Sequence, residues 1–196
     1  RYYNPGDKVP ANYQLLLTFK DESFLVFTVA MYGFISAYPD AVIDNKYYTI
    51  SRESISPLSD AYTEAEFEKL FAFAKKTLTA KALLATEQRI PGVGNGVTQD
   101  ILFNAGIHPK QKVFDLSDGQ KGVLFKSLKD TLMAMTSGRG RDTQTDLYGN
   151  EGGYKTILSS KTWKNPCPRC GSVIVKEAYL GGSVYYCSEC QKIRKT

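Results

Sequence analysis

Four cysteines lie in the last 30 residues of this 196-residue chain and form two CxxC pairs, Cys167 with Cys170 and Cys187 with Cys190. Each pair places two thiolates on one side of a tight turn. Two facing turns can form a tetrahedral cage for one zinc ion, with Zn–S bonds of about 2.3 Å. Because four thiolates leave no open coordination position, that zinc would be structural. Two disulfides are the alternative, but they need an oxidising compartment, and the sequence shows no secretion signal.

A second chemical signal is the segment 90–95, Ile-Pro-Gly-Val-Gly-Asn. Its proline lacks an amide donor, and its two glycines indicate a backbone that takes positive φ or approaches another group closely. The composition predicts a helix over 80–88, a tight turn, and a second helix over 96–104. Free amides at the start of that helix favour an anion, with Gly94 and Asn95 as contacts to a nucleic-acid phosphate. The alternative is a helical hairpin that only packs.

The net charge of +5 permits a nucleic-acid partner without requiring one. Basic residues flank the turn on both sides, and we expect them to surround one phosphate site; a solvated basic surface is the alternative. They are Lys75, Lys76, Lys81, Lys110 and Lys112, followed by Arg139, Arg141, Lys155, Lys161 and Lys164.

Residues 138–156 are rich in glycine and polar residues and show no periodicity, so the sequence predicts a long loop there. Arg139 and Arg141, with glycines between them, suit close backbone contact with a phosphate or a base. A plain flexible linker is the other interpretation.

The elements that must position these residues begin with a predicted β-meander over 12–38. Its strands are expected at 12–20, 24–32 and 34–38, and the first two are apolar enough to be buried on both faces. Three strands rarely form an independent domain, so we expect them to complete a sheet whose other strands precede Arg1. Residues 39–62 read as a connector.

Two capping boxes predict the starts of further helices. Thr63 with Glu66 opens an amphipathic helix to about Lys76, and Ser117 with Gln120 opens one to about Ser137. Between the cysteine pairs, the sequence predicts a β-hairpin with a two-residue turn at 181–182.

Three polar residues near the turn are given structural roles. We expect His108, beside Pro109, to be structural, and Glu87 and Asp100 to lie on helix surfaces or at helix ends. The sequence contains no apolar run of about 18 residues, the length expected of a membrane span.

Several motifs occur here in the order seen in one known family, and the chain resembles the formamidopyrimidine-DNA glycosylase / endonuclease VIII family. The motifs cover the last two thirds of the chain. They are Pro57-Leu58-Ser59, Lys81 to Gln88, Pro91 to Asn95, Gly106-Ile107-His108-Pro109, Gly149 to Tyr154, and the four cysteines.

The resemblance implies an α+β fold in three parts. Residues 1–60 would be the C-terminal strands of an N-terminal β-sandwich, residues 61–160 a helix–two-turn–helix DNA-binding domain, and residues 161–196 a zinc finger formed by the four-cysteine β-hairpin. DNA would bind in the cleft between the sandwich and the other two parts.

The resemblance also implies a base-excision-repair enzyme acting on oxidised bases in double-stranded DNA. Such an enzyme extrudes the damaged base, cuts the glycosidic bond through an N-terminal proline amine, and nicks the strand through a Schiff base. We expect a monomer with one structural Zn²⁺, a lesion-bearing or abasic-site duplex as partner, and a cytoplasmic, nucleoid-associated location. Asn95 would hold a phosphate beside the lesion. The other expected DNA contacts are Gly94, Lys81, Tyr32, Arg139, Arg141, Tyr154 and Lys155.

The chain departs from the family pattern at three places. It has no N-terminal Pro-Glu pair, so no catalytic residue is expected in it, and its start at Arg1 without Met suggests a missing N-terminal portion. Where the family has Arg-Arg-Phe-Gly, residues 30–33 read Ala-Met-Tyr-Gly, which leaves Tyr32 as the wedge into the base stack. The hairpin tip at 181–183 lacks the phosphate-binding arginine usual there.

Two functions therefore stay open. One is a DNA glycosylase and AP lyase, of which this chain carries the DNA-binding and zinc-finger part. The other is a catalytically inactive DNA-binding relative. A third idea is an RNA-binding or ribosome-associated protein, which shares the helix–two-turn–helix, but strands followed by a zinc hairpin in this order argue against it.

Overall fold

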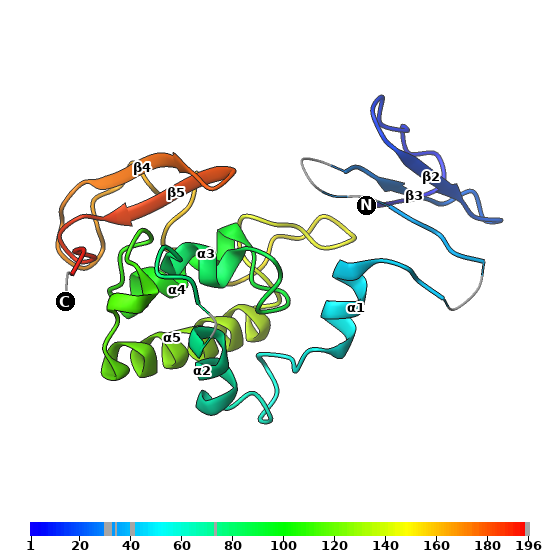
Figure 1. The fold of residues 1–196 in the computed structure, drawn as a ribbon. Helices are drawn as coiled ribbons and strands as arrows, with labels where there is room; N and C mark the ends of the chain where they lie inside the picture. The colour runs from blue at the N-terminus through cyan, green and yellow to red at the C-terminus, as the bar shows by residue number, and fades with distance from the viewer. Residues whose placement is uncertain (30–32, 34, 40–41, 73, 195–196) are drawn as a thin grey trace.

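The computed structural model describes residues 1–29, 33, 35–39, 42–72 and 74–194. An N-terminal three-stranded sheet and a C-terminal two-stranded hairpin lie on either side of a group of helices, as Figure 1 shows. Helix α1 lies between the sheet and the other helices (Figure 1). Among the described helices, none is long and apolar enough to span a membrane.

The N-terminal sheet contains β1 (Tyr2–Tyr3), β2 (Leu15–Thr18) and β3 (Phe24–Phe27) in the order β1-β3-β2, and both pairings are antiparallel. The first two predicted strands are present but shorter than expected. The predicted third strand at 34–38 is wrong for its described residues 35–38, which form no strand. The edge of β3 opposite β2 is paired with β1.

The prediction that the first two strands are buried on both faces is not met in this structure. Burial alternates along β3, where Phe24 and Val26 are buried and the residues after them only half-buried. Along β2, Leu17 and Thr18 are exposed. This alternation is the pattern of a sheet that is covered on one face.

Helix α1 (Lys46–Glu53) lies inside the segment that we predicted to be a connector, so that prediction was wrong. The Asn45 side chain caps the helix by accepting hydrogen bonds from the amides of Tyr47 (3.0 Å) and Tyr48 (3.1 Å). None of the residues of α1 is buried. The helix is short and polar on average, so its composition resembles that of a connector, which explains why the sequence did not reveal it.

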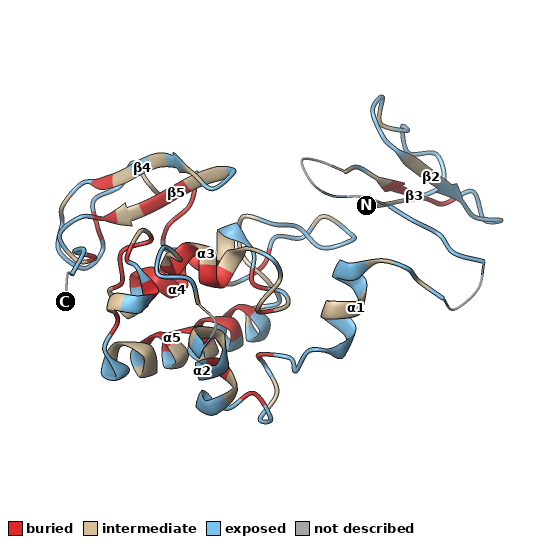
Figure 2. Cartoon of the chain, in the orientation of Figure 1, coloured by how far each residue is buried: buried red, intermediate tan, exposed pale blue. Residues whose placement is uncertain are grey.

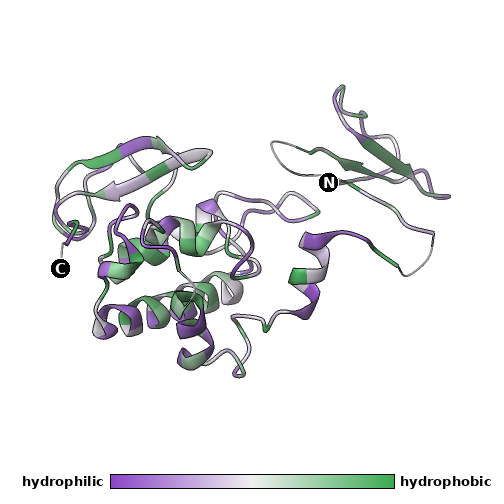
Figure 3. Ribbon diagram, viewed as in Figure 1, coloured by the Kyte–Doolittle hydropathy of each residue, from purple (hydrophilic) through white to green (hydrophobic). Residues whose placement is uncertain are grey.

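Four helices form the main core: α2 (Glu64–Ala72), α3 (Ala80–Ala85), α4 (Asn95–Ala105) and α5 (Asp118–Ser137). A short 3₁₀ turn, η1 (Val113–Asp115), precedes α5. Buried residues are concentrated on α3, α4 and the inner face of α5 in Figure 2, and Figure 3 shows that these stretches are largely hydrophobic. The fully buried apolar residues include Phe67, Leu83, Ile101, Leu124 and Leu128.

The helix ends follow the predicted capping signals closely in one case and partly in others. Ser117 and Gln120 form the complete capping box of α5. Thr63 accepts the amide of Glu66 at 3.3 Å, although α2 ends at Ala72, short of the expected Lys76. Helix α3 ends at Ala85 and not at 88, because Glu87 and Gln88 have positive φ angles of 57° and 48°.

The C-terminal hairpin consists of β4 (Ile174–Tyr179) and β5 (Gly182–Cys187). Because Tyr179 pairs with Gly182, the two turn residues are Leu180 and Gly181, one position earlier than predicted. Their φ angles of 52° and 73° are the left-handed values that type I′ hairpin turns require. The hairpin packs through a second apolar cluster that includes Phe103, Leu158, Ile174 and Tyr185.

Candidate metal centre and nucleic-acid interface

The two CxxC turns bring all four cysteine sulfurs together at the base of the hairpin, with every pair within 4.8 Å. Sγ of Cys167 lies 3.8 Å from that of Cys190, and Sγ of Cys170 lies 3.5 Å from that of Cys187. A disulfide would need about 2.05 Å. Four ligands about 2.3 Å from one zinc ion in a tetrahedron would be about 3.8 Å apart. The donor set and its dimensions therefore fit a tetrahedral metal ion.

Backbone hydrogen bonds hold both cysteine turns in place. In the first turn, Cys167 donates to the carbonyl of Ser172 at 2.7 Å. Hydrogen bonds from Ser172 lower the pKa of the Cys170 thiol to about 6, whereas burial raises the pKa of the Cys190 thiol to about 12. Four thiolates within 4.8 Å of one another repel each other, and a bound cation would offset that repulsion.

The second cysteine turn is tied to the helices by Gln191, a fully buried residue that sequence reasoning missed. Its Oε1 accepts the amide of Cys187 at 3.0 Å, and its Nε2 donates to the carbonyl of Ile107 at 2.9 Å. Because Ile107 follows α4, this side chain links the metal centre to the exit of that helix.

The glycine turn ends where α4 begins. Gly92 has a φ of 82°, Gly94 is the N-cap, and the Gly94 carbonyl accepts the amides of Val97 and Thr98, both at 3.1 Å. The amides that precede Val97 in α4, those of Asn95 and Gly96, have no partner within the helix. Gly94 and Asn95 are exposed. The helix predicted at 96–104 starts one residue later and ends one residue earlier than α4.

The tip of the hairpin docks beside this helix start. Nδ2 of Asn95 donates to the carbonyl of Ser183 at 3.2 Å, so the side chain that we expected to face a phosphate also holds the hairpin. Gln99, one turn further along α4 and buried, donates to the same carbonyl at 3.0 Å and accepts the amide of Tyr185 at 2.9 Å. Gln99 was not predicted as a site residue, and only its position one helical turn after Asn95 could have indicated it.

Lys81 was predicted to belong to the basic surface around the turn, but only 2% of it is exposed. Its ammonium donates to the carbonyl of Tyr179 and lies 5.5 Å from the centroid of that ring. Burial lowers the pKa of Lys81, and the charge of Glu177 opposes the shift. As it lies here, Lys81 holds the end of β4, and Asn95 holds the start of β5.

Asp100 was expected on the surface or at an end of a helix, and that prediction was wrong, because the residue is fully buried. Its two oxygens accept the amides of Ile157 (3.0 Å) and Leu158 (2.8 Å). Burial raises the pKa of Asp100, and these two backbone hydrogen bonds act against that rise. Asp100 therefore anchors residues 157–158, which come after the long loop, to helix α4.

The loop 138–156 folds back on itself and is crossed by backbone hydrogen bonds of its own. Isolated bridges pair Arg141 with Tyr154 and Thr145 with Glu151. Gly138 accepts the amide of Gly153 at 2.7 Å, which closes the loop at its base. The loop thus presents its two arginines from a fixed position after α5.

Arg141 points from this loop to the start of α4. A Cβ atom placed on Gly96 would lie 2.3 Å from a guanidinium nitrogen of Arg141, so the missing side chain at 96 makes room for that guanidinium. The two residues line a cavity of about 300 Å³ together with Asn95, Thr143 and Ser183. A cation thus lies beside the free amides of a helix N-terminus, which suits an anion between them.

The remaining predicted contacts lie at different depths. Arg139 is exposed, with a positive φ of 55°. Tyr154 is half-buried and hydrogen-bonded to Asp100, and burial raises the pKa of its hydroxyl. The side chain of Lys155 is 81% exposed and lies 3.9 Å from Asp142. Tyr32 lies outside the described residues.

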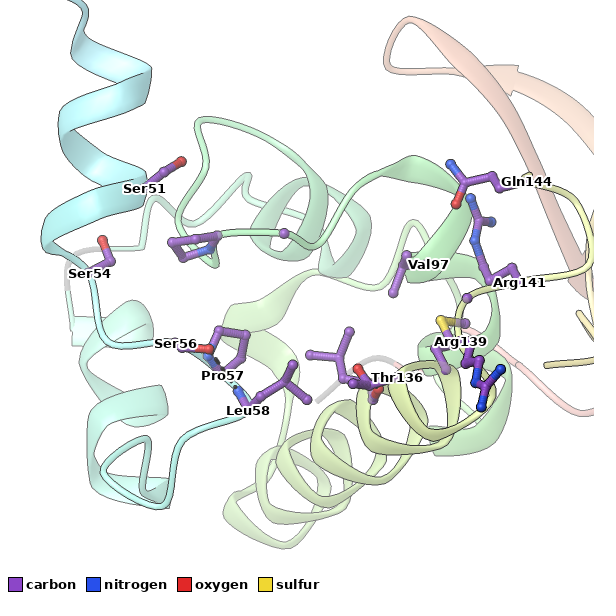
Figure 4. A pocket seen from close by; sticks show the side chains of 15 residues that line it. Ser51, Ser54, Ser56, Pro57, Leu58, Val97, Thr136, Arg139, Arg141 and Gln144 are labelled. Atoms are coloured by element: carbon purple, nitrogen blue, oxygen red, sulfur yellow. Dashed lines mark hydrogen bonds between the residues drawn. The ribbon is translucent and has the colours of Figure 1, made fainter. Parts of the chain in front are cut away.

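A larger groove of about 630 Å³ runs past the same arginines. Figure 4 shows Ser51 of α1 and Ser54, directly after that helix, on one side, and Arg139, Arg141 and Gln144 on the other. Leu58, Val97, Leu132 and Met135 also line it, so its lining combines apolar side chains with cations.

His108 has the structural environment that we expected. It is buried in the turn after α4, where its Nδ1 accepts the amide of Lys110 at 3.0 Å. Its ring meets that of Tyr186 edge-on at 4.3 Å, and burial lowers its pKa. Glu87, also expected at a surface, is exposed and forms an ion pair with Arg89.

No protein-family model matches the chain. The formamidopyrimidine-DNA glycosylase of Carboxydothermus hydrogenoformans is 31% identical over 139 residues, which are 69% of this chain and 52% of that protein. Its counterpart in Shouchella clausii is 26% identical over 193 residues, which are 96% of this chain and 69% of that protein. The solved complex of Lactococcus lactis Fpg with DNA containing an abasic site has a TM-score of 0.73 at 25% identity, covering 98% of this chain and 70% of that one.

The chain spans about half the length of several curated relatives that it matches, at 52%, 53% and 51% of their sequences. The Lactococcus protein is similar in fold across nearly the whole of this chain. The likeness therefore includes the N-terminal sheet, the helices and the cysteine hairpin together.

Proposed function

Because this chain belongs to the formamidopyrimidine-DNA glycosylase / endonuclease VIII family and corresponds to its C-terminal part, we propose that it carries the DNA-binding and zinc-finger part of a base-excision-repair DNA glycosylase and AP lyase. Its partner is double-stranded DNA with an oxidised base or an abasic site. The observation that carries this proposal is the convergence of Asn95, the first amides of α4 and Arg141 beside the hairpin tip.

The proposed phosphate contact forms at the start of α4. The exposed turn at Gly94 and Asn95 and the free amides of Asn95 and Gly96 face an anion. The second N–H of Asn95 Nδ2 is available to a phosphate oxygen, and Arg141 supplies the countercharge. Arg139 and Lys155 extend the cationic surface along the loop. Tyr154 and Lys81 act through the elements that they hold, the loop and the hairpin tip, and Tyr32 remains the proposed wedge into the base stack.

We assign the metal centre to one structural Zn²⁺ bound by Cys167, Cys170, Cys187 and Cys190. Four thiolates complete its coordination shell, so the ion supplies no Lewis-acid chemistry. Its contribution is to fix a hairpin whose own core is small. Through Gln191 and Ser183, that hairpin then keeps its place against both ends of α4.

The proposed domains keep the boundaries expected from the sequence. Residues 1–60 belong to the β-sandwich domain, 61–160 to the helix–two-turn–helix domain, and 161–196 to the zinc finger. The groove of about 630 Å³ between α1 and the arginine-bearing loop supports a DNA path between the first domain and the other two.

Covalent trapping tests the enzyme assignment. A glycosylase that acts through a Schiff base is captured on abasic-site DNA when borohydride reduces that intermediate. The protein expressed from its full reading frame is mixed with an abasic-site duplex and borohydride, and the reaction is resolved by denaturing electrophoresis. We expect a protein–DNA adduct that is absent with undamaged duplex. Tight binding of the abasic duplex without an adduct would reject the enzyme and retain only DNA binding.

A further inference from the structure

Two lysine-bearing segments that are far apart in the sequence run side by side in the fold. The amide of Ala80 donates to the carbonyl of Gln111 at 2.8 Å, and that of Val113 donates to Leu78 at 2.9 Å. A bridge between Thr79 and Lys112 lies between these two bonds. The basic clusters before and after the glycine turn therefore join each other and do not surround Asn95.

Three of these lysines, Lys75, Lys76 and Lys112, form an exposed group that we name the lysine face. Asp115 lies next to Phe114 and three residues after Lys112, and it forms no ion pair within the described residues. Three other acidic side chains are paired with cations outside the face. Glu66 pairs with Lys69 at 2.6 Å, Glu87 with Arg89 at 2.7 Å, and Glu177 with Lys110 at 2.7 Å. Within the described part of the chain, none of the three face lysines forms an ion pair. Three lysines against the one carboxylate of Asp115 leave the lysine face with a net charge of +2.

One exposed aromatic ring, that of Phe114, accompanies the lysine face. Phe114 is 66% exposed, and the ammonium of Lys76 lies 5.4 Å from the centroid of its ring. An exposed phenyl ring beside lysines offers a stacking surface for a nucleobase next to contacts for its phosphate. A partner recognised by charge alone would not need this ring.

A groove of about 540 Å³ opens next to the lysine face, between the end of α2 and the hairpin tip. It is lined by Lys75, Thr79, Arg89, Tyr179 and Leu180, among others. Its volume is in the range of sites that hold one small molecule, about 300–1,000 Å³. A single nucleotide unit is of that class, whereas a duplex is too broad to enter.

We propose that the lysine face and this groove bind a single-stranded segment of DNA, at a site separate from the duplex contact at Asn95. The hairpin tip lies between the two sites, since Tyr179 contacts Lys81 on one side and Ser183 contacts Asn95 on the other. Phosphates contact the three lysines, and one base stacks on Phe114. The inference rests on the proposed function only in taking DNA as the common partner.

Fluorescence anisotropy on the full chain tests this assignment with three DNAs: a blunt abasic-site duplex, the same duplex with a single-stranded extension on either end, and the extension alone. Wild type is compared with Lys75→Gln/Lys76→Gln/Lys112→Gln. We expect one of the extensions to tighten wild-type binding about tenfold or more. The triple variant should lose that gain, bind the lone strand at least about tenfold more weakly, and show a salt slope lower by about 2 units.

Two further variants separate the possible causes. Lys8→Gln/Lys126→Gln/Lys192→Gln removes the same charge from exposed lysines elsewhere and should keep the gain. Asn95→Ala should weaken blunt-duplex binding but leave lone-strand binding intact, so failure of the duplex site is distinguishable from failure of the lysine face. The proposal is overturned if neither extension tightens wild-type binding, or if both triple variants lose the gain equally. It is also overturned if polyglutamate, at the same concentration of negative charge as the DNA strand, displaces that strand from the wild type.

Discussion

Gly96 is informative at the scale of single residues because its lack of a side chain determines where a cation lies. The Arg141 guanidinium occupies the space that a Cβ at 96 would fill, beside the free amides of α4. An arginine near the positive end of a helix dipole needs a compensating anion. The Asp100 carboxylate supplies part of that compensation, and the proposed phosphate would supply the rest.

This arrangement predicts an unusual effect of Gly96→Ala. The new methyl group must displace the guanidinium, which is the flexible end of a long side chain, while alanine favours the helix by about 0.5–1 kcal/mol. We expect an unchanged or slightly raised melting temperature together with abasic-duplex affinity about threefold to tenfold lower. Arg141→Gln should lose about as much, and the double variant little more, because both changes remove one interaction. Additive losses would show that the two residues act separately.

Asp100 gives a second residue-scale prediction, this one on stability. Its carboxylate accepts two backbone amides, whereas an asparagine side chain offers one oxygen and places an NH₂ group against the other amide. We expect Asp100→Asn to lower the free energy of unfolding by about 1–3 kcal/mol, measured by urea denaturation. Asn104→Asp, about one turn further along the same helix, provides a comparison outside that contact, at a side chain whose amide donates to Thr131 at 3.1 Å. Equal stability of wild type and Asp100→Asn would contradict the role of Asp100 as the anchor of the 157–158 segment.

Individual site residues were predictable from the sequence only where spacing or backbone demands are distinctive. The cysteines and the Gly94-Asn95 turn belong to this class. Asp100, Gln99 and Gln191 do not, because their roles depend on which distant backbone groups come to lie against them. A buried carboxylate and an exposed one look alike in a sequence, and only tertiary packing distinguishes them.

At the scale of elements, the hairpin and α4 depend on each other. The hairpin contributes the Ser183 carbonyl to Asn95 and Gln99, and α4 contributes Gln99 to the Tyr185 amide. The proposed zinc ion fixes the other end of the hairpin. Loss of the metal should therefore loosen the hairpin tip from α4 and so weaken DNA binding at the proposed site.

Metal removal tests this coupling. We expect about one zinc per chain by elemental analysis, and a strong chelator should release it with loss of the cooperative transition that includes the hairpin. Affinity for abasic-site duplex should fall at least about tenfold and return when zinc is added back. Cys187→Ser, which removes a buried ligand, should reproduce the loss. A chain that contains no zinc, or that binds DNA equally well without it, would refute the structural role.

The boundaries of the helices and of the hairpin turn were predictable from the sequence only in part. The capping box at Ser117 set the start of α5 correctly, because it encodes its own hydrogen bonds. Helix α1 was missed, since its eight residues are polar on average and bury none of their side chains, so the segment reads as a connector. The hairpin turn was misplaced by one residue, because Leu180 adopts a positive φ that sequence rules assign to glycine.

At the scale of the whole molecule, the fold places three surfaces around the hairpin tip and the helix start. The proposed phosphate site lies at α4, the apolar groove with two arginines lies toward α1, and the lysine face lies beyond the tip. The order of these parts along the chain was predictable from its motifs. Their arrangement was not, since the lysines before and after the glycine turn pair with each other through backbone bonds that no local pattern encodes.

The most direct test of the account is competitive binding of an abasic-site duplex against a matched undamaged duplex, with wild type and Asn95→Ala. We predict that wild type prefers the abasic duplex and that the variant binds it about tenfold more weakly, as expected for the loss of a hydrogen bond to a charged group. Tyr179→Phe, which removes one hairpin–helix hydrogen bond on the other side of the tip, should stay within about twofold of wild type. Unchanged affinity and preference in Asn95→Ala would contradict the claim that the start of α4 binds the DNA backbone.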